Sequence, residues 1–148
     1  MEFKPVVHEY KTSLVWTGEK KGTLSCEGKP DIKGACPPEF GGHKDIWTPE
    51  DLFVASIELC TMSTFLWLAG KQGLEIISYR SEALGQASMS EGKMRYTHLE
   101  VRPTVEVPSE DDVRNAEKLF GDIEKWCLIN NSICTKVEIM PDIRVRHD

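Results

Sequence analysis

The longest apolar stretch of the chain runs from Thr48 to Gly70 and is predicted to form one buried helix. Its sequence, TPEDLFVASIELCTMSTFLWLAG, places apolar side chains on every face of a helix. Thr48 suits the N-cap, Pro49 suits the first helical position, and the glycines at 70 and 73 suit a helix end. A helix that is apolar all round is either buried or spans a membrane. Glu58 and several Ser and Thr residues inside the stretch favour burial.

A hairpin is predicted in front of this helix. Residues 6–16 and 23–27 are rich in Val, Thr, Leu and aromatic residues, and Gly18 to Gly22 is interpreted as the loop between two strands. Residues 28–47 contain four glycines and three prolines, which is typical of an extended connection. A short strand within it, at 32–36, completes the predicted N-terminal part.

Two further strands are predicted after the helix, at 74–88 and at 96–107, with a turn at 90–93. In the second strand apolar and polar residues alternate, and the apolar set is Leu99, Val101, Pro103, Val105 and Val107. Such alternation predicts a sheet with one face on a core and the other in water. We therefore expect this sheet to be antiparallel and half exposed.

The last third of the chain predicts a second helix and a final strand. Ser109 begins an acidic N-terminal turn, and apolar residues then recur at steps of three and four as far as Cys127. A turn around Asn130 and a strand at 136–146 follow. The fold class is therefore α+β, with antiparallel sheets packed on a long central helix, as one domain over 1–148. Its parts are an N-terminal strand lobe (1–47), the central helix (48–70) and a C-terminal strand-helix-strand lobe (71–148).

Composition and charge limit the kinds of binding partner and the cellular compartment that are expected for this chain. The chain has 148 residues and a net charge of −6, and its longest basic run is the pair Lys20 and Lys21. A surface for nucleic acid or for anionic lipid needs clustered Lys and Arg, so neither partner is expected. The N-terminus lacks an apolar segment of signal-peptide length, and we expect a cytoplasmic protein that binds no membrane.

The cysteines are interpreted as free thiols. There are five, an odd number, and no CxxC pair occurs among them. Cys26, Cys36 and His43 match no common metal-site spacing and would leave one ligand missing, so no metal is expected. Cys134, just before the last strand, is interpreted as a packing residue, since free Cys often behaves as a small buried hydrophobe.

Cys60 and Cys127 stand apart from the other cysteines. Each lies on a predicted helix face that should point inward, and two helices packed on one sheet could bring them together. Such a pair can cycle between dithiol and disulfide if one sulfur becomes a thiolate. Cys60 lies too far from the helix N-terminus for the dipole to activate it, so a cation from elsewhere is needed. The candidates are Lys20, Lys21, His43 and Arg80.

Two segments of the chain resemble the signatures of a known family. They are Thr48-Pro-Glu-Asp-Leu-Phe followed by Cys60, and Trp126-Cys-Leu-Ile-Asn-Asn-Ser-Ile. Together, at this separation, they resemble the OsmC/organic hydroperoxide resistance (Ohr) family from about Val15 to Val145. The resemblance implies an OsmC-like fold in an intertwined homodimer, with active sites at the subunit interface.

The resemblance also implies an activity, that of an antioxidant thiol peroxidase acting in the stress response. Cys60 would attack an organic hydroperoxide and become a sulfenic acid, and Cys127 would resolve it as a disulfide. A dithiol or lipoyl-linked reductant would then reset the pair. No metal, haem or nucleotide cofactor is implied.

Glu50 matches the glutamate of the family's site. A separation of ten helical residues is a rise of about 15 Å, so Glu50 is predicted to serve the Cys60 of a partner subunit. The alternative is that Glu50 only complements the positive end of the helix. Family members place an arginine in the first hairpin loop, where this chain has Lys20 and Lys21. A lysine cannot present the planar guanidinium fork, so weaker activation of the thiol is predicted.

Two other functions are compatible with the sequence. The missing arginine leaves open a catalytically weak protein of the same fold that binds an apolar small molecule at the dimer interface. A thiol sensor that signals oxidation to another protein is the third hypothesis. Independently of these functions, the alternative for Lys20 and Lys21 is that they are ordinary lysines in a solvated turn.

Overall fold

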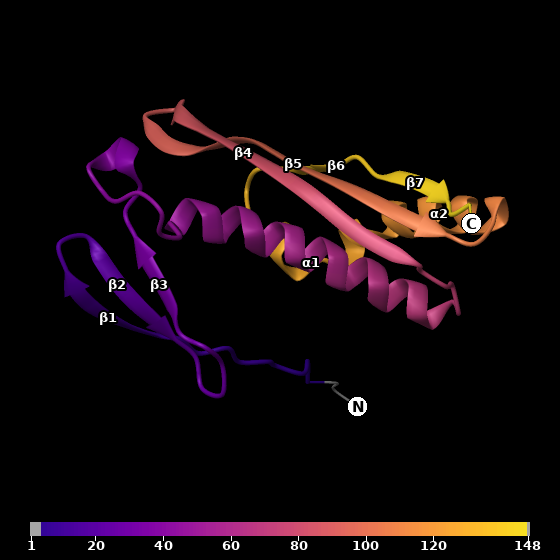
Figure 1. Ribbon diagram of the computed structural model, residues 1–148, viewed down its shortest axis with the longest axis horizontal. Coiled ribbons are helices and arrows are strands. Elements are labelled where there is room, and N and C mark those ends of the chain that lie inside the picture. The colour runs from indigo at the N-terminus through magenta and orange to yellow at the C-terminus, as the bar shows by residue number, and fades with distance from the viewer. Residues whose placement is uncertain (1–3, 148) are drawn as a thin grey trace. The chain divides into compact units, whose positions relative to one another are not determined.

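The computed structural model describes residues 4–147, which form two compact units, one ending at Leu52 and the other beginning at Phe53. The first unit contains a three-stranded antiparallel sheet in the order β1-β2-β3, shown in indigo and purple in Figure 1. Its strands are β1 (Ser13–Gly18), β2 (Lys21–Ser25) and β3 (Ile32–Ala35), followed by the 3-10 helix η1 (Pro38–Phe40). The short third strand is confirmed.

The hairpin of the first unit is tighter than the sequence pattern predicted. Gly18 pairs with Lys21, so the turn consists of Glu19 and Lys20 alone, and residues 6–12 lie outside the sheet. Both Gly18 and Glu19 have positive φ angles, of 116° and 51°, which lets the chain reverse in two residues. The five-residue loop from Gly18 to Gly22 was therefore a wrong prediction.

The long helix, α1 (Pro49–Lys71), begins where the sequence predicted. The Thr48 hydroxyl accepts a hydrogen bond from the Asp51 backbone N–H at 3.0 Å, and the Asp51 carboxylate accepts one from the Thr48 backbone N–H at 3.1 Å. These two reciprocal bonds satisfy two amides that the first helical turn leaves without an intrahelical partner. The start of α1 is thus fixed by residues next to one another in sequence.

The second unit is built on a long antiparallel hairpin of β4 (Ser78–Ser90) and β5 (Lys93–Val107). Glu91 and Gly92 form its turn, and β4 begins four residues later than predicted. The alternation in β5 is confirmed, because Leu99, Val101 and Val105 are all buried. One face of this hairpin therefore carries the core of the unit.

The sheet is not wholly antiparallel, which corrects the prediction. The predicted last strand is split into β6 (Val137–Ile139) and β7 (Asp142–Val145), and both pair with β5 in parallel. The chain crosses over the sheet through α2 (Glu110–Trp126) before it returns, and a helical crossover brings a strand back in the same direction. Pro141, which has no N–H to donate, lies at the break between the two strands.

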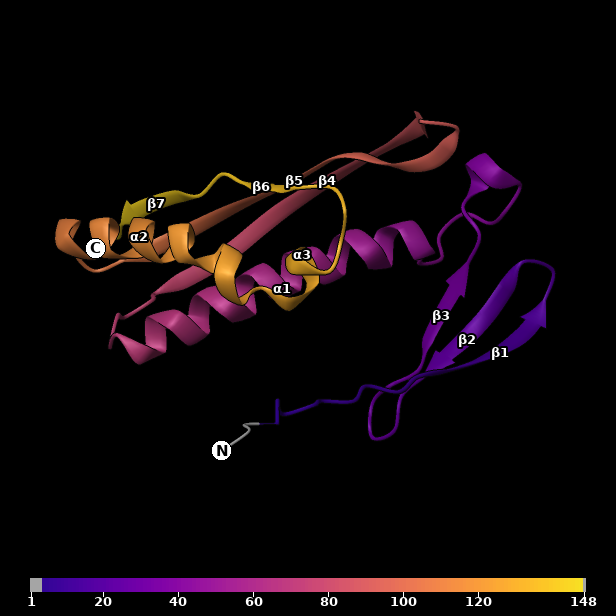
Figure 2. The same cartoon turned by 180° about the vertical axis from the view of Figure 1, so that it is seen from behind.

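Both long helices pack on one face of this sheet, as Figures 1 and 2 show from opposite sides. The rings of Phe65 in α1 and Phe120 in α2 stack with centroids 4.2 Å apart, and Val105 of β5 packs beneath them. The Ser109 side chain caps α2, as predicted. The predicted turn at Asn130 is instead a short helix, α3 (Leu128–Asn131).

Within this chain α1 is buried on one side only. Ile57, Thr61 and Phe65 lie against the sheet, whereas Leu59 is 60% exposed and Trp67 is 44% exposed. By length and composition α1 could also cross a membrane. Its buried side nevertheless makes it the core helix of the second unit, and the carboxylate of Glu58 accepts a hydrogen bond from Ser81 of β4 at 2.6 Å.

Candidate functional site

The structure brings two of the sequence-predicted residues together in the second unit. The Cys127 sulfur lies 3.0 Å from the Cys60 sulfur, in hydrogen-bonding position, and both residues are free cysteines. Cys60 lies near the middle of α1, and Cys127 is both the C-cap of α2 and the N-cap of α3. Two helices on one face of the sheet therefore produce the thiol pair.

The two thiols differ in access. Cys127 is fully buried, with an exposed fraction of 0%, whereas Cys60 is half-buried. The backbone of Cys127 is held on both sides: its N–H donates to the Ile123 carbonyl at 2.9 Å, and its carbonyl accepts from the Asn131 N–H at 3.0 Å. A molecule arriving from solvent meets Cys60 first.

Burial, and after it the adjacent Cys60 thiol, raise the pKa of the Cys127 thiol to about 11. Two hydrogen bonds act in the opposite direction, one involving the backbone of Asn130 and one the side chain of Thr64. Hydrogen bonds to the thiolate favour its charged form, so these groups ease the loss of the Cys127 proton. At neutral pH Cys127 is a protonated thiol.

Thr64 and Asn130 were not singled out from the sequence. Thr64 follows Cys60 by four residues, and side chains at that spacing share one helix face, so the signal for it was present. Asn130 acts through its backbone, which no side-chain pattern indicates. Both residues act directly on the Cys127 thiol.

Four other sequence-predicted residues belong to the first unit, and they are described within it: Glu50, Lys20, Lys21 and His43. Glu50 is half-buried in the first turn of α1. The Lys20 ammonium donates to the Phe40 carbonyl at 3.2 Å, and Lys21 pairs with Glu19 at 3.1 Å. His43 also lies 3.5 Å from the Glu19 carboxylate. The Glu19 carboxylate therefore pairs with Lys21 and lies beside His43, and Lys20 is held by a neutral carbonyl.

Arg80 and Glu58 belong to the second unit. Arg80 is exposed on β4, and its charge helps to lower the pKa of Asp142, although the hydrogen bond from Arg144 is the larger cause. Glu58 helps to raise the pKa of Tyr79 to about 12, after burial, which is the main cause. Glu58 therefore faces β4 and is paired there.

The remaining cysteines form no metal site. Among residues 4–147, no three His, Cys, Asp or Glu side chains are grouped so as to hold a metal ion. Cys26 and Cys36 are half-buried in the first unit. Cys134 is exposed, which corrects the prediction that it packs in the core.

A family model described as OsmC-like protein matches residues 42–140. This span covers well over half of the chain and includes both Cys60 and Cys127. The chain therefore belongs to the OsmC-like protein family, and the resemblance drawn from the two sequence motifs is confirmed.

Individual relatives agree with the family and the fold. The uncharacterised protein YmaD of Bacillus subtilis (strain 168) is 24% identical over 143 residues, covering 94% of this chain and 95% of YmaD. An OsmC-like protein of unknown function from Vibrio cholerae superposes with a TM-score of 0.83 at 25% identity, covering 91% of this chain and 99% of that one. An organic hydroperoxide resistance protein from Elizabethkingia anophelis superposes with a TM-score of 0.74 at 16% identity, covering 97% and 100%.

Proposed function

We propose that this protein is a thiol-dependent peroxidase that reduces organic hydroperoxides to alcohols. The observation that carries the proposal is the pair of sulfurs 3.0 Å apart, one half-buried and one fully buried. That asymmetry supports the proposed roles, in which Cys60 reacts with the peroxide and Cys127 resolves the resulting sulfenic acid. Membership of a family that includes organic hydroperoxide resistance proteins supports the choice of substrate.

The reaction proceeds in two steps. The Cys60 thiolate attacks the terminal peroxide oxygen, an S–O bond forms, the O–O bond breaks, and the alkoxide leaves as the alcohol after taking a proton. Cys60 is then a sulfenic acid. The Cys127 sulfur attacks the Cys60 sulfur, the S–O bond breaks, and water leaves. The product is a Cys60–Cys127 disulfide, and two electrons have passed to the peroxide.

A dithiol or lipoyl-type reductant completes the cycle. One of its thiolates attacks the half-buried Cys60 sulfur, because the Cys127 sulfur is covered. The second thiol of the reductant then attacks the reductant sulfur of this mixed disulfide and releases Cys60, so that both cysteines return to the reduced state. A single compact dithiol therefore suffices for each turnover in the cytoplasm.

The proposal includes a homodimer in which each site is shared. Exposed apolar side chains in both units support it: Leu14 and Trp16 are 66% and 74% exposed, and Leu59 is exposed on α1. Glu50 of one subunit would then serve the Cys60 of the other. Lys20 is the better candidate for the activating cation, because Lys21 is already paired with Glu19.

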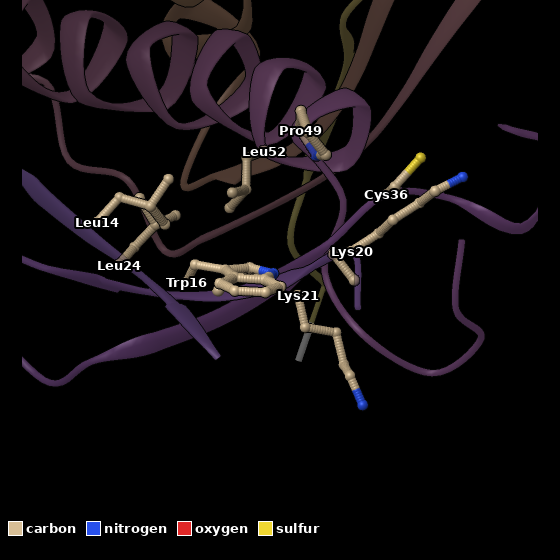
Figure 3. A pocket seen from close by; sticks show the side chains of 11 residues that line it. Leu14, Trp16, Lys20, Lys21, Leu24, Cys36, Pro49 and Leu52 are labelled. Carbon is tan, nitrogen blue, oxygen red and sulfur yellow. The ribbon is translucent and has the colours of Figure 1, made fainter. Parts of the chain in front are cut away.

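A second candidate function rests on a cavity inside the first unit. Its volume is about 420 Å³, and Leu14, Trp16, Leu24 and Leu52 form apolar walls beside Lys20 and Lys21 (Figure 3). Such a lining suits the alkyl part of a small molecule. The protein would then bind an apolar ligand without turning it over.

The two functions are separated by following the loss of cumene hydroperoxide with dihydrolipoamide as reductant. The peroxidase proposal predicts rapid consumption by the native protein, a fall to the background rate in Cys60→Ser, and a strong loss in Cys127→Ser. Cys134→Ser, which removes an exposed thiol, is the matched control and should keep the native rate. A native rate equal to that of Cys60→Ser would reject the peroxidase and leave the binding function.

A further inference from the structure

Lys20 and Cys36 lie opposite each other, one residue beyond the paired ends of β2 and β3. The ladder between β2 and β3 ends with the pair Lys21 and Ala35, and one step further the Cys36 N–H donates to the Lys20 carbonyl at 3.0 Å. Residues opposite each other in an antiparallel pair carry their side chains on the same face. The thiol and the amine therefore start from neighbouring positions.

The ends of these two side chains meet at one backbone carbonyl. The Lys20 ammonium donates to the Phe40 oxygen at 3.2 Å, and the Cys36 thiol donates to the same oxygen at 3.6 Å. In Figure 3 the Cys36 sulfur and the Lys20 nitrogen extend in the same direction at the edge of the cavity. Because both groups bond to this one oxygen, the distance between the Lys20 nitrogen and the Cys36 sulfur cannot exceed the sum of these two bond lengths.

The Phe40 carbonyl that holds them is itself fixed. The η1 turn is closed by hydrogen bonds from the Phe40 N–H to Pro37 at 3.1 Å and from the His43 N–H to Cys36 at 2.9 Å. A Cβ at Gly42 would lie 1.7 Å from the Cys36 carbonyl oxygen, so only glycine permits this close return of the chain. The turn thus keeps sulfur and nitrogen near each other.

We propose that Lys20 and Cys36 form a redox-responsive modification site in which an organic hydroperoxide drives an S–N cross-link. The Cys36 thiol takes the terminal peroxide oxygen and becomes a sulfenic acid, and the alcohol leaves. The neutral Lys20 amine then attacks the sulfur, the S–O bond breaks, and water departs with one amine hydrogen. The chain loses two hydrogen atoms in total, and sulfur has been oxidised by two electrons.

In this proposal the Lys20 amine nitrogen is the group that reacts with the Cys36 sulfenic acid. Sulfenic acids condense either with a thiol to give a disulfide or with a nitrogen to give a sulfenamide. Cys26, the other cysteine of the first unit, follows the far end of β2, about 20 Å along the strand from Lys20. The cross-link would tie the β1–β2 turn to the end of β3 beside the cavity and would remove the Lys20 charge. It does not depend on the peroxidase activity proposed above.

The test uses a variant that keeps Cys36 as its single thiol, made by changing the other four cysteines to Ser. After treatment with excess cumene hydroperoxide, the intact mass should fall by two hydrogens, and digestion should yield one peptide joining Lys20 to Cys36. A single thiol cannot form an internal disulfide, so the mass change identifies the cross-link. The same joined peptide should appear in the oxidised native protein, which covers the case in which the variant folds poorly.

Two controls decide the outcome. Lys20→Arg keeps the positive charge but offers no amine. The Cys36 sulfenic acid of this variant should therefore persist and be labelled by dimedone. A variant whose single thiol is Cys26, half-buried in the same unit, should show no loss of two hydrogens. The proposal is overturned if the Cys36 variant and the native protein give sulfenic or sulfinic acid without the joined peptide, or if Lys20→Arg loses two hydrogens equally.

Discussion

The sulfur of Cys127 lies 3.0 Å from that of Cys60, although 67 residues separate them in sequence. The contact exists because α1 and α2 share one face of the sheet and are fixed to each other by the stacked rings of Phe65 and Phe120. A disulfide needs sulfurs about 2.05 Å apart, so closure requires a movement of about 1 Å. The fold therefore holds the two thiols close enough to form a disulfide with a small movement.

Removing the Thr64 hydroxyl should slow disulfide closure. In Thr64→Val the shape is kept, but the hydrogen bond that favours the Cys127 thiolate is lost. A bond of this kind contributes about 1 kcal/mol, so closure should slow by roughly fivefold. Stopped-flow tryptophan fluorescence after peroxide mixing measures it, with formation of the Cys60 sulfenic acid unchanged. Ser63→Ala, which removes an exposed hydroxyl one position earlier, should leave both rates at the native value.

The stability of the reduced protein should fall between pH 9 and pH 11. Burial raises the Cys127 pKa from 9.0 to about 11 in the folded protein, so the unfolded chain loses this proton first as pH rises. The stabilisation is fully present below pH 9 and is lost toward pH 11, by about 3 kcal/mol. Urea unfolding under reducing conditions measures this. Cys127→Ser should show a shallower decline, and an identical decline would refute the assignment.

Changing Glu58 should shift the titration of Tyr79. Burial is the main cause that raises the Tyr79 pKa to about 12, and the Glu58 charge adds to it. In Glu58→Gln the Tyr79 pKa should drop but stay above 10.0, because burial remains. Ultraviolet titration against a Tyr79→Phe reference isolates this tyrosine. Glu82→Gln, on the exposed side of the same strand, should change nothing.

Two glycines should respond to alanine in opposite ways. A Cβ at Gly85 in β4 would lie 2.8 Å from both Val54 and the Tyr96 ring, so Gly85→Ala forces α1 away from the sheet and should cost about 1–3 kcal/mol. Gly121 in α2 has no atom within 4 Å of such a Cβ. Gly121→Ala should therefore stabilise the protein by about 0.5–1 kcal/mol. Thermal unfolding of both variants provides the comparison, and equal shifts would contradict it.

The parts of the fold set by neighbouring residues could be predicted from the sequence. The start of α1 follows from Thr48 and Asp51, which bond to each other three residues apart. The alternation in β5 likewise marks the buried face directly. The parallel pairing of β6 and β7 could not be predicted in this way, because it depends on how α2 carries the chain across the sheet.

The candidate site was predictable to a similar extent. The apolar stripe of α2 ends on Cys127, which indicated that this thiol points inward, and the contact with Cys60 followed once both helices covered one face. The proximity of Lys20 and Cys36 gave no such signal. It depends on the two-residue turn at Glu19, which shifts Lys20 opposite Cys36, whereas a longer loop would have separated them.

The central claim is that Cys60 and Cys127 act as one redox pair, and counting thiols tests it most directly. The native protein has five cysteines, and one equivalent of cumene hydroperoxide should leave three free thiols. Peptide mapping should then show a Cys60–Cys127 disulfide, while Cys60→Ser should lose none of its four thiols under the same conditions. Five thiols surviving in the native protein, or a disulfide between any other two cysteines, would contradict the account.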